Sequence, residues 1–241
     1  MLSIFSKKTF LLDIIAGIPD IHCHVLPGID DGAKDVQSST DLLHKYRDLG
    51  FKKIIATPHT LGEIYTNTRA SIAKAYTEVK GLVPEVSLSY ASEYMLDYEF
   101  EQLLESDSLL CLKDNYLLVE LSYFQPPIHL MELIFSITSK GYIPVIAHPE
   151  RYAYYHKDLS IFEIFKGKGC HLQLNALSLS SHYGSHVQRQ AFKLLASGAY
   201  DFIGTDTHRL EHLEKIAEIK ISSKYLATLR NVALNNDRVF S

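Results

Sequence analysis

Seven short apolar runs alternate with longer amphipathic stretches along the chain, and this alternation restricts the folds that the sequence can form. The expected strands cover residues 20–25, 53–57, 86–93, 116–120, 143–147, 171–175 and 201–205. Several of these runs are continuous and rich in Ile and Val, which is typical of parallel strands buried on both faces. Because parallel strands are joined by crossovers that are usually helices, the pattern predicts an α/β fold.

Three of the amphipathic stretches end at a glycine that directly precedes the next strand. The expected helices cover 36–49, 128–139 and 187–196, and the glycines are Gly50, Gly141 and Gly198. Glycine is common just beyond a helix C-terminus, which supports helix-to-strand connections at these positions. Seven strand–helix units in about 220 residues predict a distorted (β/α)7-type barrel related to the TIM barrel. A doubly wound open sheet is the alternative.

Composition and charge narrow the classes of protein. Hydrophobic residues make up 46% and charged residues 22% of the 241 residues, and we find no linker or low-complexity segment, so we expect a single domain. The formal net charge is −4 and no Lys/Arg run exceeds two residues, so we expect no nucleic-acid partner. The three cysteines are widely spaced, which predicts a reducing, cytoplasmic setting and no thiolate zinc site.

The first 18 residues precede the first expected strand. Lys7 and Lys8 stand before an apolar run, as in a signal peptide, but Asp13 interrupts that run and no small-residue cleavage site follows it. We therefore interpret 1–18 as an N-terminal helix or arm and 19–241 as the barrel. No stretch reaches the roughly 18 uninterrupted apolar residues of a membrane-spanning helix, so we expect no membrane insertion.

Nearly every expected strand ends in side chains that can bind metal. These residues are His22, His24, Asp31, His59, Glu93, Glu120, His148, Asp206 and His208, with Asn175 after the sixth strand. In barrels of this class the active site lies at the C-terminal ends of the strands. Imidazole and carboxylate groups suit Zn, Mn or Fe(II). One such residue alone is more often an ordinary hydrogen-bonded loop residue, but five histidines and four acids at consecutive strand ends favour a metal cluster.

Other polar residues receive simpler interpretations. The remaining histidines are expected to be ordinary core or surface residues: His44, His129, His156, His171, His182, His186 and His212. Asn175 is expected to cap a turn rather than contact substrate, and Cys23 to fill space in the core. Asp30, Arg209 and His212 are the candidates for a general acid, and nothing in the sequence favours one of them.

The order of these motifs resembles that of the polymerase-and-histidinol-phosphatase (PHP) superfamily. The motifs are His22-x-His24, Thr57-Pro58-His59, Ser92-Glu93, Ala147-His148-Pro149-Glu150-Arg151 and Asp206-x-His208. More narrowly, the run DIHCHVLPGIDDGA from Asp20, with IIATPH from Ile54 and HPER from His148, resembles the bacterial protein-tyrosine phosphatase branch. That branch is manganese-dependent, acts on tyrosine autokinases and is linked to capsule and exopolysaccharide export. The resemblance covers about residues 19–210.

The resemblance implies a centre of three divalent metal ions, with Mn²⁺ first and Fe²⁺ or Zn²⁺ as alternatives. It assigns His22, His24, Glu93 and Asp206 to one ion, Glu93, Glu120 and His148 to a second, and Asp31, His59 and His208 to a third. Arg151 matches a phosphate-binding arginine of the family. A second family arginine has no counterpart at position 213, which is Leu, and Arg209 is the nearest candidate for that substrate contact.

These residues favour hydrolysis of a phosphoester by a metal-bound hydroxide. The resemblance implies that the substrate is a phosphotyrosine protein, such as the tail of a bacterial tyrosine kinase. Three dications exceed the charge of four carboxylates and a hydroxide by about one unit, and Arg151 adds another, which suits a phosphate dianion. A small-molecule phosphatase, for example one acting on histidinol phosphate, is the first alternative. A PHP nuclease is disfavoured by the acidic balance, and a non-enzymatic, metal-stabilised binding module is disfavoured by the many shared ligands.

Overall fold

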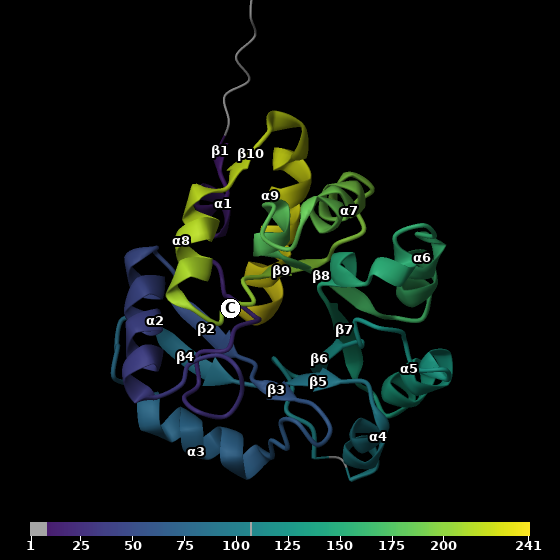
Figure 1. Ribbon diagram of the computed structural model, residues 1–241, viewed down its shortest axis with the longest axis horizontal. Helices are drawn as coiled ribbons and strands as arrows, with labels where there is room; N and C mark the ends of the chain where they lie inside the picture. Colours follow the sequence, from purple (N-terminus) through teal and green to yellow (C-terminus); the bar gives the residue numbers. More distant parts are fainter. Residues whose placement is uncertain (1–8, 107) are drawn as a thin grey trace, which may run out of the picture.

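Parallel strands β2 to β9 form a barrel with helices around it (Figure 1). The computed structural model describes residues 9–106 and 108–241. One sheet has the order β3-β5-β6-β7-β8-β9, and β2 pairs separately with β4. The strands are β2 (Lys53–Ala56), β3 (His59–Thr60), β4 (Ser87–Tyr90), β5 (Glu93–Met95), β6 (Tyr116–Glu120), β7 (Ile143–Ala147), β8 (His171–Asn175) and β9 (Phe202–Gly204).

The chain segment 20–24 closes the ring between β2 and the residues after β9. The backbone N–H of Ile55 donates to the carbonyl of Asp20 at 2.8 Å, and that of Asp206 donates to the carbonyl of His22 at 2.7 Å. The Asp20 carboxylate reinforces the closure, because it accepts hydrogen bonds from the Tyr46 hydroxyl at 2.7 Å and the Thr205 backbone N–H at 3.0 Å. The closed ring confirms the barrel and excludes the doubly wound open sheet.

The expected strands match the observed ones best on the far side of the barrel from this closure. The predictions for β6, β7 and β8 agree with the structure to the residue. The expected strand 20–25 is wrong as a regular strand, because it pairs with its neighbours only through isolated bridges. The expected strand 86–93 is split into β4 and β5. The neighbouring segment is split in the same way into β2 and β3, and the break contains Pro58, which has no N–H to donate to a β-ladder.

Helices cover the outside of the barrel between successive strands (Figure 1). The three helices expected from the sequence are confirmed, with both ends within two residues of the prediction. The helices are α2 (Val36–Asp48), α3 (Arg69–Val79), α4 (Tyr98–Glu105), α5 (Leu130–Ser139), α6 (Ser160–Gly167), α7 (Ser185–Ala196), α8 (Leu210–Glu218) and α9 (Ser223–Phe240). Short 3-10 turns follow β7, at η1 (Pro149–Arg151) and η2 (Ala153–Tyr155), and β8, at η3 (Ala176–Leu179).

A small apolar cluster fills the inside of the barrel, and α9 carries one of its members. The buried members are Ile21, Ile55, Ala91, Leu112, Leu118, Val145, Ala147, Phe202 and Phe240. Phe240 is the last residue of α9 and is fully buried. Leu118 and Glu120 lie two residues apart on β6 and therefore share a face, so the face that fills the barrel ends in a candidate metal ligand.

The described part of the expected N-terminal arm is attached to the barrel. Residues 1–8 of the segment 1–18 lie outside the described residues. β1 (Thr9–Phe10) pairs antiparallel with β10 (Lys220–Ile221), and α1 (Leu12–Ile15) follows it. Leu11 is fully buried. Among the described residues, every helix is too short or too polar to cross a membrane.

Asn236 of α9 gives a test of the barrel closure. Its side-chain oxygen accepts a hydrogen bond from the Ile203 N–H at 3.0 Å, and its amide nitrogen donates to the Pro19 carbonyl at 3.0 Å. Asn236→Leu should lower the free energy of unfolding by about 2–4 kcal/mol, because each buried polar group left without a partner costs about 1–3 kcal/mol. Urea denaturation measures this loss. Asn231→Leu, at an exposed position of the same helix, should change stability little, and equal effects of both variants would contradict the closure role.

Candidate metal centre

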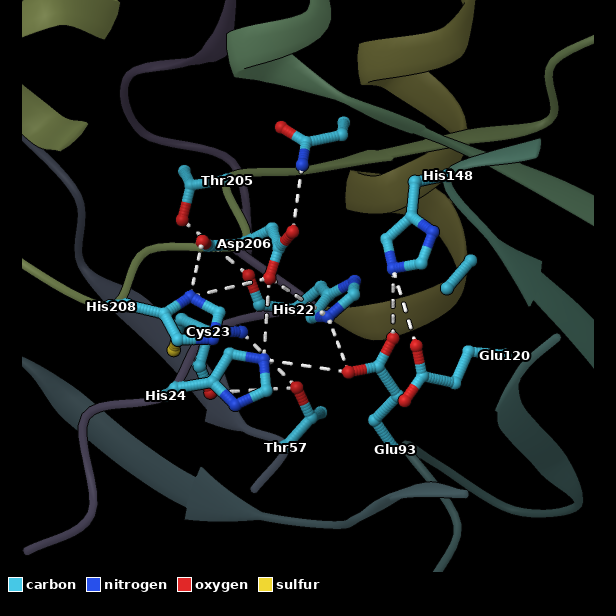
Figure 2. Close-up of polar contacts among 12 residues, drawn as sticks. His22, Cys23, His24, Thr57, Glu93, Glu120, His148, Thr205, Asp206 and His208 are labelled. Atoms are coloured by element: carbon cyan, nitrogen blue, oxygen red, sulfur yellow. Dashed lines mark hydrogen bonds and ion pairs between the residues drawn. The ribbon is translucent and has the colours of Figure 1, made fainter. Parts of the chain in front are cut away.

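The expected metal ligands meet at the C-terminal rim of the barrel. Figure 2 labels seven of the nine, and their donor atoms converge on a common region. Their burial differs across the rim. His22, His24 and Glu93 are fully buried, whereas the side chain of Asp31 is 50% exposed and those of His59 and His208 are 14% and 13% exposed. The centre therefore has a closed inner side and a side open to solvent.

Four of these side chains form the buried inner group, which consists of His22, His24, Glu93 and Asp206. The His22 Nε2 atom lies 3.2 Å from Glu93 Oε2 and 3.4 Å from Asp206 Oδ1. The corresponding distances from His24 Nε2 are 3.5 Å and 3.3 Å. Ligand atoms of a tetrahedral site with bonds of about 2.1 Å lie about 3.4 Å apart, so the spacing fits one cation.

The hydrogen bonding of this inner group also supports a cation site. Nε2 of His22, Nε2 of His24 and Oε2 of Glu93 are buried and have no hydrogen-bond partner among the described residues. Buried polar side-chain atoms almost always have a partner, so three orphaned atoms facing one another need an explanation. A cation between them satisfies all three lone pairs at once. The residues present therefore fit a bound metal.

The residues of the second expected group, Glu93, Glu120 and His148, also lie close together, and His59 joins them. His148 Nε2 lies 3.1 Å from Glu93 Oε1 and 3.9 Å from Glu120 Oε2. His59 was expected only in the third group, but its Nδ1 lies 3.0 Å from Glu93 Oε2 and 3.1 Å from Glu120 Oε1. His59 thus stands between two groups, because its other ring nitrogen lies 3.6 Å from Asp31 Oδ1.

The third group lies on the open side. His208 Nε2 is 3.3 Å from Asp31 Oδ1, and the His208 ring stacks on the His24 ring with centroids 3.9 Å apart. His24, Asp31, His59 and His208 each offer a ligand atom within 4.8 Å of the others. Since Asp31 is half exposed, this group meets the solvent first.

The backbone adopts uncommon conformations to aim these ligands. His148 and Asp206 have φ angles of 35° and 52°, in the left-handed region that side chains other than glycine rarely adopt. Such residues concentrate at functional sites, where the surrounding structure holds them in place. Two glycines leave the space that the inner histidines need. A Cβ on Gly204 would come within 2.6 Å of the His22 Cβ, and one on Gly32 would collide with the His24 backbone.

Two buried groups behind the inner histidines fix how those rings face the centre. His22 Nδ1 lies 2.9 Å from the Gln173 side-chain oxygen, and His24 Nδ1 lies 2.8 Å from Asp30 Oδ2. A proton held on Nδ1 leaves the Nε2 lone pair for a metal. The sequence analysis missed Gln173, although a glutamine inside an apolar strand was a usable signal. It considered Asp30 as a general acid, whereas the structure gives Asp30 this orienting contact.

The charges of the buried groups compensate one another in the metal-free protein. Burial alone would lower the pKa of His24, as would neighbouring His59, but Asp30 and Asp206 raise it to about 10. Burial would raise the pKa of Glu93, but its histidine neighbours, His22 first, hold it well below its usual range. Protons on the imidazoles therefore balance the carboxylates until cations replace them.

Arg151 lies on the cleft side of the centre and contacts two aromatic rings. Its guanidinium carbon is 4.6 Å from the Tyr123 ring centroid and 4.2 Å from that of Tyr183, and its Nη1 donates to Asp206 Oδ2 at 2.9 Å. The Asn175 amide donates to the same oxygen at 2.8 Å. These two bonds occupy Oδ2 of Asp206 and leave Oδ1 for the inner group. The sequence analysis missed both tyrosines and this contact of Asn175, whose expected turn-capping bond to the Leu177 N–H is present at 2.9 Å.

A cleft of about 540 Å³ opens over the centre. Its lining includes Asp31, His59, Glu120, His148, Arg151, Asp206 and His208. Arg209 lines a neighbouring cavity that shares Asp31 and His208 with the cleft, and it is not among the residues that line the cleft itself. Burial, and after it the His208 imidazole, lowers the pKa of His212 to about 4, so His212 is neutral at pH 7 and the structure argues against it as a general acid.

Gln173 offers a test of how the centre is organised. Gln173→Leu removes the oxygen that orients His22, and such orienting contacts are worth about 10–100-fold in metal affinity. We expect the affinity for Mn²⁺, measured by competition with a chelator, to fall by about that factor while the fold is retained. Gln190→Leu replaces another buried glutamine, away from the centre, and should leave the affinity unchanged. An unchanged affinity in Gln173→Leu would show that His22 needs no such support.

The chain matches known proteins along most of its length. A family model for capsular polysaccharide synthesis proteins, CpsB/CapC, matches residues 18–232. The tyrosine-protein phosphatase YwqE of Bacillus subtilis is 32% identical over 80% of this chain and 78% of its own length. The putative tyrosine-protein phosphatase CapC of Staphylococcus aureus is 29% identical over 79% of this chain and 77% of its own length.

Solved structures agree with these matches. A crystal structure from work on YwqE of Bacillus subtilis and CpsB of Streptococcus pneumoniae, metal-dependent tyrosine phosphatases, superimposes with a TM-score of 0.81 at 29% identity. The match covers 92% of this chain and 94% of that one. Histidinol phosphate phosphatase of Lactococcus lactis shares the fold, with a TM-score of 0.53 at 14% identity over 90% of this chain and 94% of that one. The chain belongs to the CpsB/CapC family of capsular polysaccharide synthesis proteins.

Proposed function

We propose that this protein is a metal-dependent tyrosine-protein phosphatase that hydrolyses phosphotyrosine in a protein substrate. The observation that carries the proposal is the presence of Arg151 in the same cleft as the histidines and carboxylates of the candidate metal centre. Membership of a family whose relatives are named tyrosine-protein phosphatases supports it.

We propose three divalent ions, with Mn²⁺ as the physiological one. The inner group would hold the first ion. Glu93, Glu120 and a histidine would hold the second, and Asp31 and His208 would hold the third. His59 lies within reach of the last two ions. When bound, the ions would supply Lewis-acid stabilisation of the phosphoryl oxygens and would lower the pKa of a water molecule towards about 7.

Arg151 would bind two oxygens of the phosphoryl group. A guanidinium has five N–H donors in a planar fork, and the bond to Asp206 uses one of them. The rings of Tyr123 and Tyr183 both pack on the guanidinium, so little side-chain entropy would be lost when phosphate binds. Its positive charge adds to the charge surplus of the metals.

The choice of tyrosine follows from the leaving group. A phenolate has a free pKa of about 10 and leaves with little help from an acid, whereas an alkoxide from serine needs protonation. His212 is neutral at pH 7, and Asp30 is engaged with His24, so neither provides that proton. The site therefore favours phenyl esters. We extend the proposal to a cytoplasmic role on the tail of a bacterial tyrosine kinase that controls polysaccharide export.

A substrate panel tests the proposal. Phosphate release is measured from a phosphotyrosine peptide, a phosphoserine peptide and histidinol phosphate, each with Mn²⁺ and with a chelator. We expect release from the phosphotyrosine peptide that the chelator abolishes, with at least tenfold less from the other two. Preference for histidinol phosphate would indicate that the substrate is a small metabolite rather than a phosphoprotein. Release that resists the chelator would contradict a metal-dependent reaction.

Arg151→Ala tests the phosphate contact. We expect kcat/KM for a phosphotyrosine peptide to fall about 10²–10³-fold, because one oriented donor group in a catalytic site contributes that much. The bound metal, measured by elemental analysis, should remain. Arg151→Lys should recover little activity, since an ammonium cannot replace a bidentate fork. Arg189→Ala, at an exposed position of α7, is the matched control, and metal loss in Arg151→Ala would show that Arg151 acts through Asp206 instead.

A further inference from the structure

A groove of about 330 Å³ continues from the metal cleft along the segment 122–129, which follows β6. Its other wall is the turn between β5 and α4. Met95, Asp97 and Ser122 line both the cleft and this groove, so the two form one continuous depression. A substrate whose phosphate lies beside Arg151 therefore has this groove next to it.

Large apolar side chains are exposed along this depression. Phe124, which lines the cleft, is 94% exposed, and Ile128, which lines the groove, is 99% exposed. Tyr98 on the opposite wall is 70% exposed. Single exposed apolar residues are ordinary, but three around one groove that opens into a catalytic cleft are typical of a binding surface.

The segment 122–129 is held in place on both sides. The Tyr154 hydroxyl donates to the Ser122 carbonyl at 2.8 Å, and His129 Nε2 pairs with Glu101 Oε1 at 2.7 Å. Pro126 and Pro127 restrict the backbone between these contacts. Tyr123 in the same segment packs on Arg151, so the position of the groove wall is tied to that of the phosphate-binding arginine. A wall fixed before binding loses little entropy when a ligand docks.

We propose that this groove binds the polypeptide that flanks the phosphotyrosine, and that Phe124 and Ile128 select an apolar or aromatic side chain next to it. The proposal rests on the proposed phosphatase function and adds its sequence preference. A polypeptide is the occupant because a phosphotyrosine bound at the metals must continue as chain, and the groove is the continuation of its cleft. Asp97 lines the groove, so an acidic neighbour of the phosphotyrosine is disfavoured there.

The experiment compares two phosphotyrosine peptides, one with leucine and one with aspartate beside the phosphotyrosine, with phenyl phosphate as the substrate without flanks. For the wild-type protein with Mn²⁺ we expect kcat/KM about tenfold higher for the leucine peptide than for the aspartate peptide. Phe124→Ser and Ile128→Ser should each lower the ratio of leucine-peptide to phenyl-phosphate kcat/KM several-fold, and about tenfold together, because burial of such side chains is the source of the preference.

Phe135→Ser is the matched control, since Phe135 on α5 is 68% exposed and lies outside the residues that line the cleft and the groove. Its ratio should equal that of the wild type. Ratios unchanged in Phe124→Ser and Ile128→Ser would overturn the groove proposal. Unchanged ratios with an altered oligomeric state by light scattering would instead assign the surface to contact between copies of the chain. Absence of chelator-sensitive hydrolysis of phenyl phosphate by the wild type is a separate result, and it would overturn the phosphatase function itself.

Discussion

The structure depends on the mutual compensation of the carboxylates and imidazoles that are buried at the closed end of the rim. Carboxylates and imidazoles converge within hydrogen-bonding distance of one another at the closed end of the rim, where Glu93 and His22 are fully buried. Burying an unpaired charge is costly, so the metal-free protein must hold protons on its histidines to compensate. In the inner group, Nε2 of His22, Nε2 of His24 and Oε2 of Glu93 still have no hydrogen-bond partner among the described residues. Cations remove both problems, which is why metal binding and the stability of this end of the barrel are physically linked.

The irregular parts of the barrel backbone coincide with the residues that carry the candidate metal ligands. The closing segment 20–24 forms only isolated bridges, and it carries His22 and His24 at the closure. β2 and β4 each continue, after a break, as the short strands that begin with His59 and Glu93. His148 and Asp206 have left-handed backbones. The Asp20 carboxylate, with bonds to Tyr46 and Thr205, supplies part of the order that a regular ladder would provide elsewhere.

Prediction from sequence succeeded where a local pattern determines the outcome. Hydrophobic runs such as 116–120 mark buried strands, and in a parallel barrel every strand ends at the same rim, so polar residues after the runs must meet. What the sequence did not reveal depends on packing between distant segments. Three contacts are of this kind. His59 lies between two groups of candidate ligands, Gln173 bonds to His22 across 151 residues, and two aromatic rings pack on Arg151. The split of 86–93 was missed because it follows from Pro58 on the neighbouring chain segment.

The candidate ligands are buried on one side of the rim and partly exposed to solvent on the other. Gln173 and Asp30 lie behind the inner group, whereas Asp31, His59 and His208 are partly exposed and line the cleft, so the centre is open to a phosphate from the cleft. Arg151 stands at the cleft on this side, and its contact with Asp206 connects it to the inner group. The same aspartate therefore connects the buried group that could hold a metal ion with the arginine that would meet the substrate. Arg151 and the more exposed candidate ligands line one cleft, so a phosphate bound there would meet both, and selectivity among phosphoproteins would depend on the surfaces beside the cleft.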